Sequence, residues 1–235
     1  MEHTNLTINA KSLRDEIVEA LQRGVILGLY QPGAPLVERE LAAQFGVSSI
    51  PVREALQELE SRGLVTKRPN RSCCVIELSP AELDQMFELR ALLEPQVIRW
   101  AAERMSAEDA ASLAPLVENL RSAAGERDFA QFFQRDLILH RRIWELSGNR
   151  FAAQALERAV LPLFAFGLMR DHRAEELNLN REVEKHEQMV RALRAGQPER
   201  AAESLSKIAS GFETHVRADA RAARGDKTRG KKSAR

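Results

Sequence analysis

Apolar residues recur at helical spacing along the chain, but the segments that carry them lengthen near residue 79. Before this position the segments are short and are separated by Gly and Pro, as at Pro32-Gly33 and Gly46. After it they are long and rich in Ala, Leu, Glu and Arg, which favour helix. We therefore predict a small domain over residues 10–78 and an antiparallel bundle of six or seven helices over residues 79–218.

Three short helices are predicted in the first domain. Leu13, Ile17 and Leu21 recur at i, i+4 and i+8, which is the stripe of an amphipathic helix. A second helix fits residues 37–45, and a third begins after Ser48, a residue type typical of the N-cap position. The second and third helices are close enough to form a helix-turn-helix.

The third helix has an inward face and a face that is free to meet a partner. Its inward stripe consists of Val52, Ala55, Leu56 and Leu59. Pro51 falls in the first turn, where a missing N–H costs little. In a helix-turn-helix the first turn of this helix projects from the core, so Ser49, Ile50 and Arg53 are presented to a partner.

Two β-prone runs, VTKRP and CCVIEL, follow the third helix and are bridged by Asn70-Arg71-Ser72. This pattern predicts a β-hairpin, or wing. The basic residues Arg62, Lys67, Arg68 and Arg71 cluster in and around it, with no acid between Glu60 and Glu77. The positive end of the domain is therefore expected at the wing.

The composition is that of an ordinary globular protein and excludes disorder over the whole chain. The 235 residues include 35 Lys or Arg and 34 Asp or Glu, which gives a formal net charge of +1, and 44% are hydrophobic. The two Cys are adjacent, so no disulfide framework is possible and a reducing, cytoplasmic location is expected. No signal-peptide pattern and no run of 18 apolar residues is present, so we expect neither secretion nor a membrane span.

Positive charge gathers at the C-terminal end of the chain. Residues 217–235 contain eight Lys or Arg against two Asp, and we predict a basic, disordered tail over residues 219–235. Such a tail attracts nucleic acid without sequence preference, or it serves only as a solubilising end. The sequence leaves both interpretations open.

Ionisable residues lie on apolar stripes of the predicted bundle helices. Arg90, Asp136, His140 and His186 each align with Leu, Val, Ile or Phe at helical spacing. An unpaired buried charge costs several kcal/mol, so these groups must meet one another, water, a metal or a ligand. A polar pocket in the bundle core is therefore predicted.

Asp136 and His140 are four residues apart and so share one helix face, where they can bind a single cation. A carboxylate combined with imidazoles suits Zn, Ni, Mn or Fe. Asp136, His140 and His186 are the candidate metal ligands, and the expected cofactor is one divalent transition metal or none.

The run PGAPLVERELAAQFGVSSIPVREALQELESRGLVTKRPNRSCCV (residues 32–75) resembles the winged helix-turn-helix of the GntR family of transcription regulators. The chain from residue 79 to about 218 resembles the FCD effector domain of the FadR-type branch, through ELRALLEP, SGN and KHEQMVRALRAG. The resemblance implies a mainly α fold, with an N-terminal winged helix-turn-helix followed by an all-α antiparallel helical bundle. It also implies a DNA-binding transcription regulator, more often a repressor, that reads double-stranded operator DNA as a homodimer.

The resemblance, together with the projecting first turn, gives the predicted DNA-binding residues: Arg39, Ser48, Ser49, Ile50, Arg53, Asn70 and Arg71. Asn70 and Arg71 fall at the tip of the wing, which enters the minor groove in the family. Ser49 stands where the family has Arg, so the operator is expected to differ at the base that this side chain meets. The alternative for Arg39 and Arg53 is an ion pair with neighbouring Glu residues.

The metal-binding branch of the FCD family uses one Asp and three His. The first three positions match Asp136, His140 and His186, but the fourth falls on Ile208. His215 follows on the same stripe, two helical turns or about 10 Å further along. Both a metal site with open positions and the absence of metal stay compatible with this pattern.

The expected effector is a small organic acid held by Arg90 together with any cation at Asp136, His140 and His186, since the planar fork of Arg matches a carboxylate. FCD regulators commonly respond to sugar acids, hydroxy acids or acyl thioesters, and the resemblance implies the same here. The alternative is that Arg90 pairs with Glu94, one helical turn along.

A metal-dependent enzyme of the helical-bundle type is the alternative function. HEQMV at residues 186–190 lacks the second His of a zinc-protease motif, and no Glu-x-x-His pair of the di-iron type is present. The nucleophile elbow, phosphate loop and dinucleotide fingerprint are missing as well. The sequence therefore favours a regulator and not an enzyme.

Overall fold

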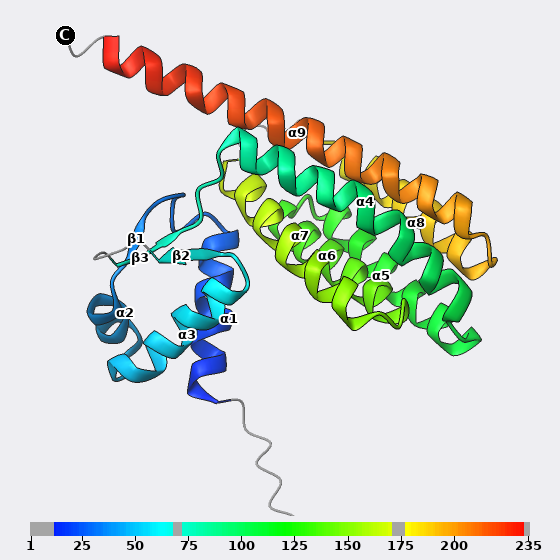
Figure 1. The fold of residues 1–235 in the computed structure, drawn as a ribbon, viewed down its shortest axis with the longest axis horizontal. Coiled ribbons are helices and arrows are strands. Elements are labelled where there is room, and N and C mark those ends of the chain that lie inside the picture. Colours follow the sequence, from blue (N-terminus) through cyan, green and yellow to red (C-terminus); the bar gives the residue numbers. More distant parts are fainter. Residues whose placement is uncertain (1–11, 68–71, 171–176, 233–235) are drawn as a thin grey trace, which may run out of the picture.

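The computed structural model describes the backbone of residues 12–67, 72–170 and 177–232. Its N-terminal elements are α1 (Leu13–Ile26), β1 (Pro35–Leu36), α2 (Glu38–Phe45), α3 (Ser49–Ser61), β2 (Val65–Lys67) and β3 (Cys73–Val75). The later elements are α4 (Pro80–Arg104), α5 (Ala107–Gly125), α6 (Phe129–Leu146), α7 (Arg150–Arg170), α8 (Leu179–Arg194) and α9 (Pro198–Lys232). The mainly α fold is confirmed: a winged helix-turn-helix is followed by a helical bundle (Figure 1).

Helix α3 packs against both α1 and α2 through the apolar stripes that the sequence shows. Gly46 ends α2 with a φ of 68°, a left-handed conformation that favours glycine. Ser48 occupies the N-cap position of α3 as predicted, but its side chain makes no capping hydrogen bond. The hydroxyl of Ser48 therefore stays exposed in front of the helix.

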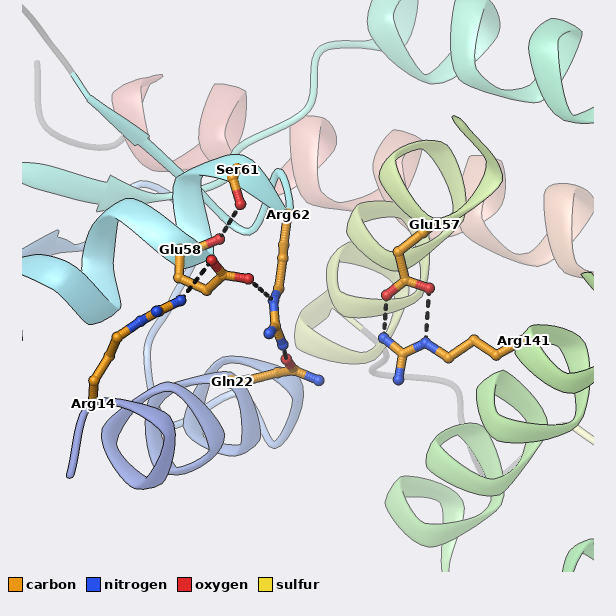
Figure 2. A network of polar contacts seen from close by, with 7 residues as sticks. All are labelled: Arg14, Gln22, Glu58, Ser61, Arg62, Arg141 and Glu157. Carbon is orange, nitrogen blue, oxygen red and sulfur yellow. Dashed lines mark hydrogen bonds and ion pairs between the residues drawn. The ribbon is translucent and has the colours of Figure 1, made fainter. Parts of the chain in front are cut away.

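Polar side chains on the surface of this domain join α3 to α1 (Figure 2). The Glu58 carboxylate accepts hydrogen bonds from Arg14 Nη2 at 2.9 Å and from Arg62 Nε at 3.0 Å. Arg62 Nη1 also donates to Gln22 Oε1 at 3.0 Å. Each partly exposed pair contributes little alone, but together they restrict how α3 lies on α1.

The three strands form an antiparallel sheet in the order β1-β3-β2, which confirms the predicted hairpin. Thr66 of β2 lies opposite Cys74 of β3. Cys74 is buried and Cys73 is half-buried, as expected for neighbours on opposite faces of a strand. The predicted DNA contacts Asn70 and Arg71 lie outside the described residues.

The bundle begins with a capping box at α4. Ser79 Oγ accepts a hydrogen bond from the Glu82 backbone N–H, and the Glu82 carboxylate accepts one from the Ser79 backbone N–H. Helix α4 then packs against α6, α7 and α9, while α8 packs against α5 and α9. Pro95 and Pro162 lie inside α4 and α7.

Helix α9 differs from the sequence prediction. A disordered tail was expected over residues 219–235, but the backbone stays helical to Lys232. The segment RADARAA, residues 217–223, is rich in Ala and Arg, and these strong helix formers extend a helix that packing has already nucleated. Within the described ranges, none of the helices has the length and apolar character needed to cross a bilayer.

Candidate functional site

The first turn of α3 forms an exposed surface at the end of the N-terminal domain. Ile50 and Arg53 point outward there, and Ile50 is 67% exposed although it is apolar. Arg39 on α2 is also exposed, whereas Ser49 is half-buried. The opposite side of α3 is buried in the core, so the helix presents one polar face with an apolar residue at its tip.

Arg53 is held by an ion pair. Its guanidinium donates to the Glu38 carboxylate, with Nη2 and Oε2 3.0 Å apart. The Arg53 side chain is nevertheless 60% exposed, so the pair is weak and easily exchanged for another anion. The ion-pair alternative thus describes Arg53 in the free protein, and it leaves the side chain accessible to a phosphate or a base.

A cluster of buried ionisable side chains lies in the core of the bundle. Helix α6 carries Asp136 and His140 on one face, and α8 brings His186 against them. Asp136 Oδ1 lies 3.3 Å from His140 Nε2 and 2.7 Å from His186 Nε2. One ligand atom from each residue falls within 4.8 Å of the other two. The structure therefore brings together the three residues predicted as metal ligands.

Hydrogen bonding fixes the orientation of His186. Its Nδ1 lies 2.7 Å from the backbone carbonyl of Glu182, and because a carbonyl only accepts, Nδ1 carries the proton. The remaining nitrogen, Nε2, faces the Asp136 carboxylate. Two lone pairs cannot face each other at this distance, so a second proton or a cation has to lie between them.

The pKa values of the pair follow from its burial and mutual attraction. Burial by itself lowers the pKa of His186, but the Asp136 carboxylate and the hydrogen bonds more than offset it, so the pKa is raised. Burial likewise favours the neutral form of Asp136, yet the charges of His186 and His140 hold its pKa far below the usual range. The attraction between the two side chains therefore favours the charged form of each.

The donor set fits a transition metal. Asp136 Oδ1, His140 Nε2 and His186 Nε2 are buried, face one another and make no hydrogen bond to any other described group. One carboxylate and two imidazoles leave open positions on a divalent ion. Ile208 lies on the wall of the same small cavity, so the residue at the family's fourth ligand position supplies an apolar surface.

Arg90, the predicted effector-binding residue, is paired with an acid on its own helix. Its Nε donates to Glu94 Oε2 at 2.8 Å, and both side chains are buried. The guanidinium also lies over the rings of Phe164 and Phe212, at 5.8 and 5.6 Å from their centroids. The alternative pairing with Glu94 is therefore what the structure shows.

Glu94 connects Arg90 to the three-residue cluster. Its Oε1 atom lies 3.8 Å from His140 Nδ1. Arg90 and Glu94 line one cavity, between α4 and α9, whereas Asp136 and His186 line another, between α6, α8 and α9. Phe212 lines the second cavity and stacks on Arg90, so its ring lies between the two groups.

Sequence reasoning gave the pairing of Arg90 with Glu94 as an alternative, but it missed the approach of Glu94 to His140 and the places of Phe164 and Phe212. The i, i+4 spacing of Arg90 and Glu94 was a usable signal for their pairing, but nothing pointed from Glu94 to His140 on another helix. Nothing in the sequence distinguishes the two Phe residues, which line a cavity or pack on Arg90, from Phe residues of an ordinary apolar core.

Comparison with known proteins assigns both parts of the chain. Residues 13–75 match the bacterial regulatory proteins of the gntR family, and residues 85–210 match the FCD domain. The chain belongs to the GntR family. It is a DNA-binding transcription regulator with an N-terminal helix-turn-helix domain and an FCD effector-binding domain.

Several relatives in this family are named regulators. The HTH-type transcriptional regulator McbR of Escherichia coli is 26% identical over 88% of this chain and 91% of its own, and its solved structure superimposes with a TM-score of 0.76. The probable D-xylose utilization operon transcriptional repressor of Paenarthrobacter nicotinovorans is 30% identical over 85% of both chains. The galactonate operon transcriptional repressor of Escherichia coli is 26% identical over 77% of this chain and 86% of its own. The family and these relatives are transcription regulators, which favours the regulator over the enzyme.

Proposed function

We propose that this GntR-family regulator is a homodimeric, cytoplasmic repressor whose affinity for its operator is controlled by a small organic acid bound in the bundle. The observation that carries the proposal is the buried cluster of Asp136, His140 and His186 within the FCD-matched residues. Buried charges need compensating partners. A cation with an organic acid bound to it would supply such partners, and the acid would bind reversibly.

Asp136, His140 and His186 would hold one divalent transition metal, with no fourth protein ligand from Ile208. The metal would offer its open positions to the oxygens of a carboxylate. Arg90 Nη1 is buried without a hydrogen-bond partner among the described residues, so it has a donor available for the same acid. The names of two relatives refer to galactonate and D-xylose, and galactonate is itself a sugar acid, which supports this ligand class.

Effector binding would require a conformational change. The cavity beside Asp136 and His186 measures about 30 Å³, close to the volume of one water molecule. An organic acid enters only if Phe212 or α9 moves, and such movement also removes the ring that separates Arg90 from the cavity. Binding would then shift the population of dimer arrangements that fit DNA.

The DNA-binding surface of the proposed repressor comprises Arg39, Ser48, Ser49, Ile50 and Arg53, with Asn70 and Arg71 of the wing. We place the division between its two domains at residue 79, where the capping box begins α4. In a homodimer two such surfaces would read half-sites in successive major grooves.

The test is thermal unfolding of the wild type and Arg90→Ala with a panel of sugar acids, hydroxy acids and simple carboxylates, each with and without a chelator. One acid is expected to raise the unfolding temperature of the wild type more than that of Arg90→Ala, and the chelator is expected to reduce the effect. Arg99→Ala, which removes an exposed ion-paired Arg on the same helix, serves as the control. If no acid stabilises the wild type, or if the acid stabilises both proteins equally, the proposed site is wrong.

A further inference from the structure

The bundle touches the N-terminal domain directly behind the recognition helix α3. Gly63 follows the C-cap of α3 and has a φ of 74°. A Cβ atom at this position would lie 2.9 Å from Pro162 Cγ and 3.7 Å from the Arg158 carbonyl oxygen, both on α7. Figure 2 shows α7, which carries Glu157, beside the end of α3 near Arg62. The backbone after α3 is therefore in van der Waals contact with a rigid proline ring.

Helix formation does not explain Pro162. A proline inside a helix removes one backbone hydrogen bond and is the least favourable residue there. Pro162 lies in the middle of α7, next to the buried Leu161 and Leu163. Helix α1 also packs against α7, but the Pro162 ring is the part of α7 that meets Gly63, and an Ala would lose that contact.

The same helix also reaches the buried cluster. Phe164, two residues after Pro162, has its ring centroid 6.4 Å from that of His140 and lies under the Arg90 guanidinium. A displacement of α7 at the cluster would therefore occur only two residues from Pro162, which contacts Gly63.

We propose that Pro162 is a positioning residue for DNA recognition, which sets the place of α3 relative to the bundle through its contact with Gly63. This role rests on the proposed homodimer, in which the two copies would meet through their bundles, so that the contact would fix the distance between the two recognition helices. An operator with two half-sites about 34 Å apart is sensitive to that distance, whereas random DNA is not.

The test is Pro162→Ala in the full-length protein, titrated with an operator obtained by selection from random DNA and with an unrelated duplex. We expect operator affinity to fall about fivefold with little change for unrelated DNA, because the half-site spacing is no longer fixed. The unfolding temperature should not fall, because Ala restores a helical hydrogen bond. If Pro162 had a merely structural role, Pro162→Ala would instead lower the unfolding temperature and weaken binding to both DNAs by the same factor.

Pro95→Ala in α4 and Pro115→Ala in α5 are matched controls, since both replace prolines inside bundle helices. They should leave the ratio of operator to random affinity unchanged. The proposal is wrong if Pro162→Ala binds operator like the wild type, or if either control loses as much.

Gly63→Ala tests the other side of the contact. The added methyl overlaps Pro162, and positive φ adds strain; Gly196→Ala, at a φ of 62° with nothing within 4 Å, shows the effect of strain alone. Gly63→Ala/Pro162→Ala should bind operator more tightly than Gly63→Ala, because the overlap is relieved. Additive losses would show that the two residues do not act on each other.

No effector or metal enters these measurements, so their failure leaves the proposed effector site standing. Sedimentation of each variant checks the dimer separately: a variant that stays dimeric and loses operator specificity supports the positioning role. A variant that loses specificity by becoming monomeric overturns it.

Discussion

Buried charge at single residues is what separates this bundle from an ordinary apolar core. Arg90 and Glu94 are fully enclosed, and each is the other's ion-pair partner. Removing one member of such a pair leaves an uncompensated buried charge, whereas removing both leaves none. The stability of the bundle should therefore depend on the pair as a unit.

Glu94→Gln is expected to lower the free energy of unfolding by about 3–5 kcal/mol, because Arg90 stays charged without its partner. The double variant Arg90→Met/Glu94→Leu should lose far less. Urea unfolding measures both, and Glu199→Gln, which breaks the exposed pair with Arg99, should cost less than about 1 kcal/mol. A double variant as unstable as the single one would show that shape rather than charge governs this site.

Ile208 would decide how many protein ligands a bound metal has. Because Ile208 lines the same cavity as Asp136 and His186, Ile208→His should add a fourth donor and tighten Zn²⁺ binding about tenfold or more. Isothermal titration calorimetry measures the affinity. Ala209→His is the matched control, since Ala209 lines the other cavity and a His there should leave Zn²⁺ affinity unchanged. Equal affinity of Ile208→His and the wild type would contradict the site.

Arg53 is an exposed basic residue near the start of α3. Arg53→Ala should lose about 1–3 kcal/mol of operator binding with relaxed base preference, while Arg71→Ala should weaken binding to all sequences more evenly. Competition titrations with single-base operator variants measure the preference, and Arg99→Ala serves as the control for losing a paired surface Arg. Equal losses on operator and random DNA for Arg53→Ala would exclude base reading.

At the scale of elements, the start of α4 marks where the bundle begins. The hydrogen bond from the Ser79 hydroxyl, with the backbone bond beside it, holds the pKa of Glu82 below its ordinary value. A carboxyl whose pKa is lowered on folding stabilises the fold above its ordinary pKa, and this contribution disappears as pH falls through the lowered value. The cap is therefore an acid-sensitive part of α4.

Glu82→Gln should unfold at a lower temperature than the wild type at neutral pH, because the amide replaces a charged acceptor in the capping box. The difference should shrink once the pH falls below 4.5, the ordinary pKa of a Glu, and vanish as the wild-type carboxyl takes up its proton. Calorimetry across pH measures it. Glu88→Gln, in an exposed position of the same helix, should show a smaller and flatter difference; identical curves for both variants would disprove the cap effect.

At the scale of the whole molecule, one chain offers one recognition helix, which makes too few base contacts for specific binding by itself. We expect sedimentation to show twice the mass of the chain at micromolar concentration, and footprinting to show two half-sites about one DNA turn apart. A monomer at this concentration, or a footprint covering one half-site, would contradict the proposed homodimer.

The sequence by itself determined the local elements and the residues that face inward on them. The stripe of α3, the turn at Gly46 and the shared face of Asp136 and His140 follow from a helical period of 3.6 residues and from local capping, so short-range rules suffice. The same rules placed an ionisable residue, His186, on the inner face of another helix. The high positive charge of the C-terminal segment predicted disorder, but its Ala and Arg residues also favour helix, and the helix continues to Lys232.

Only the tertiary structure decided which inward faces meet. The sequence predicts that Arg90 and His186 both face inward. In the packed bundle His186 pairs with Asp136, whereas Arg90 pairs with Glu94 and lies over the Phe212 ring. The contact of Gly63 with Pro162 likewise joins residues far apart in the chain. Periodicity fixes the direction of a side chain from its own helix, whereas its partner depends on how helices from distant segments pack, which no local pattern contains.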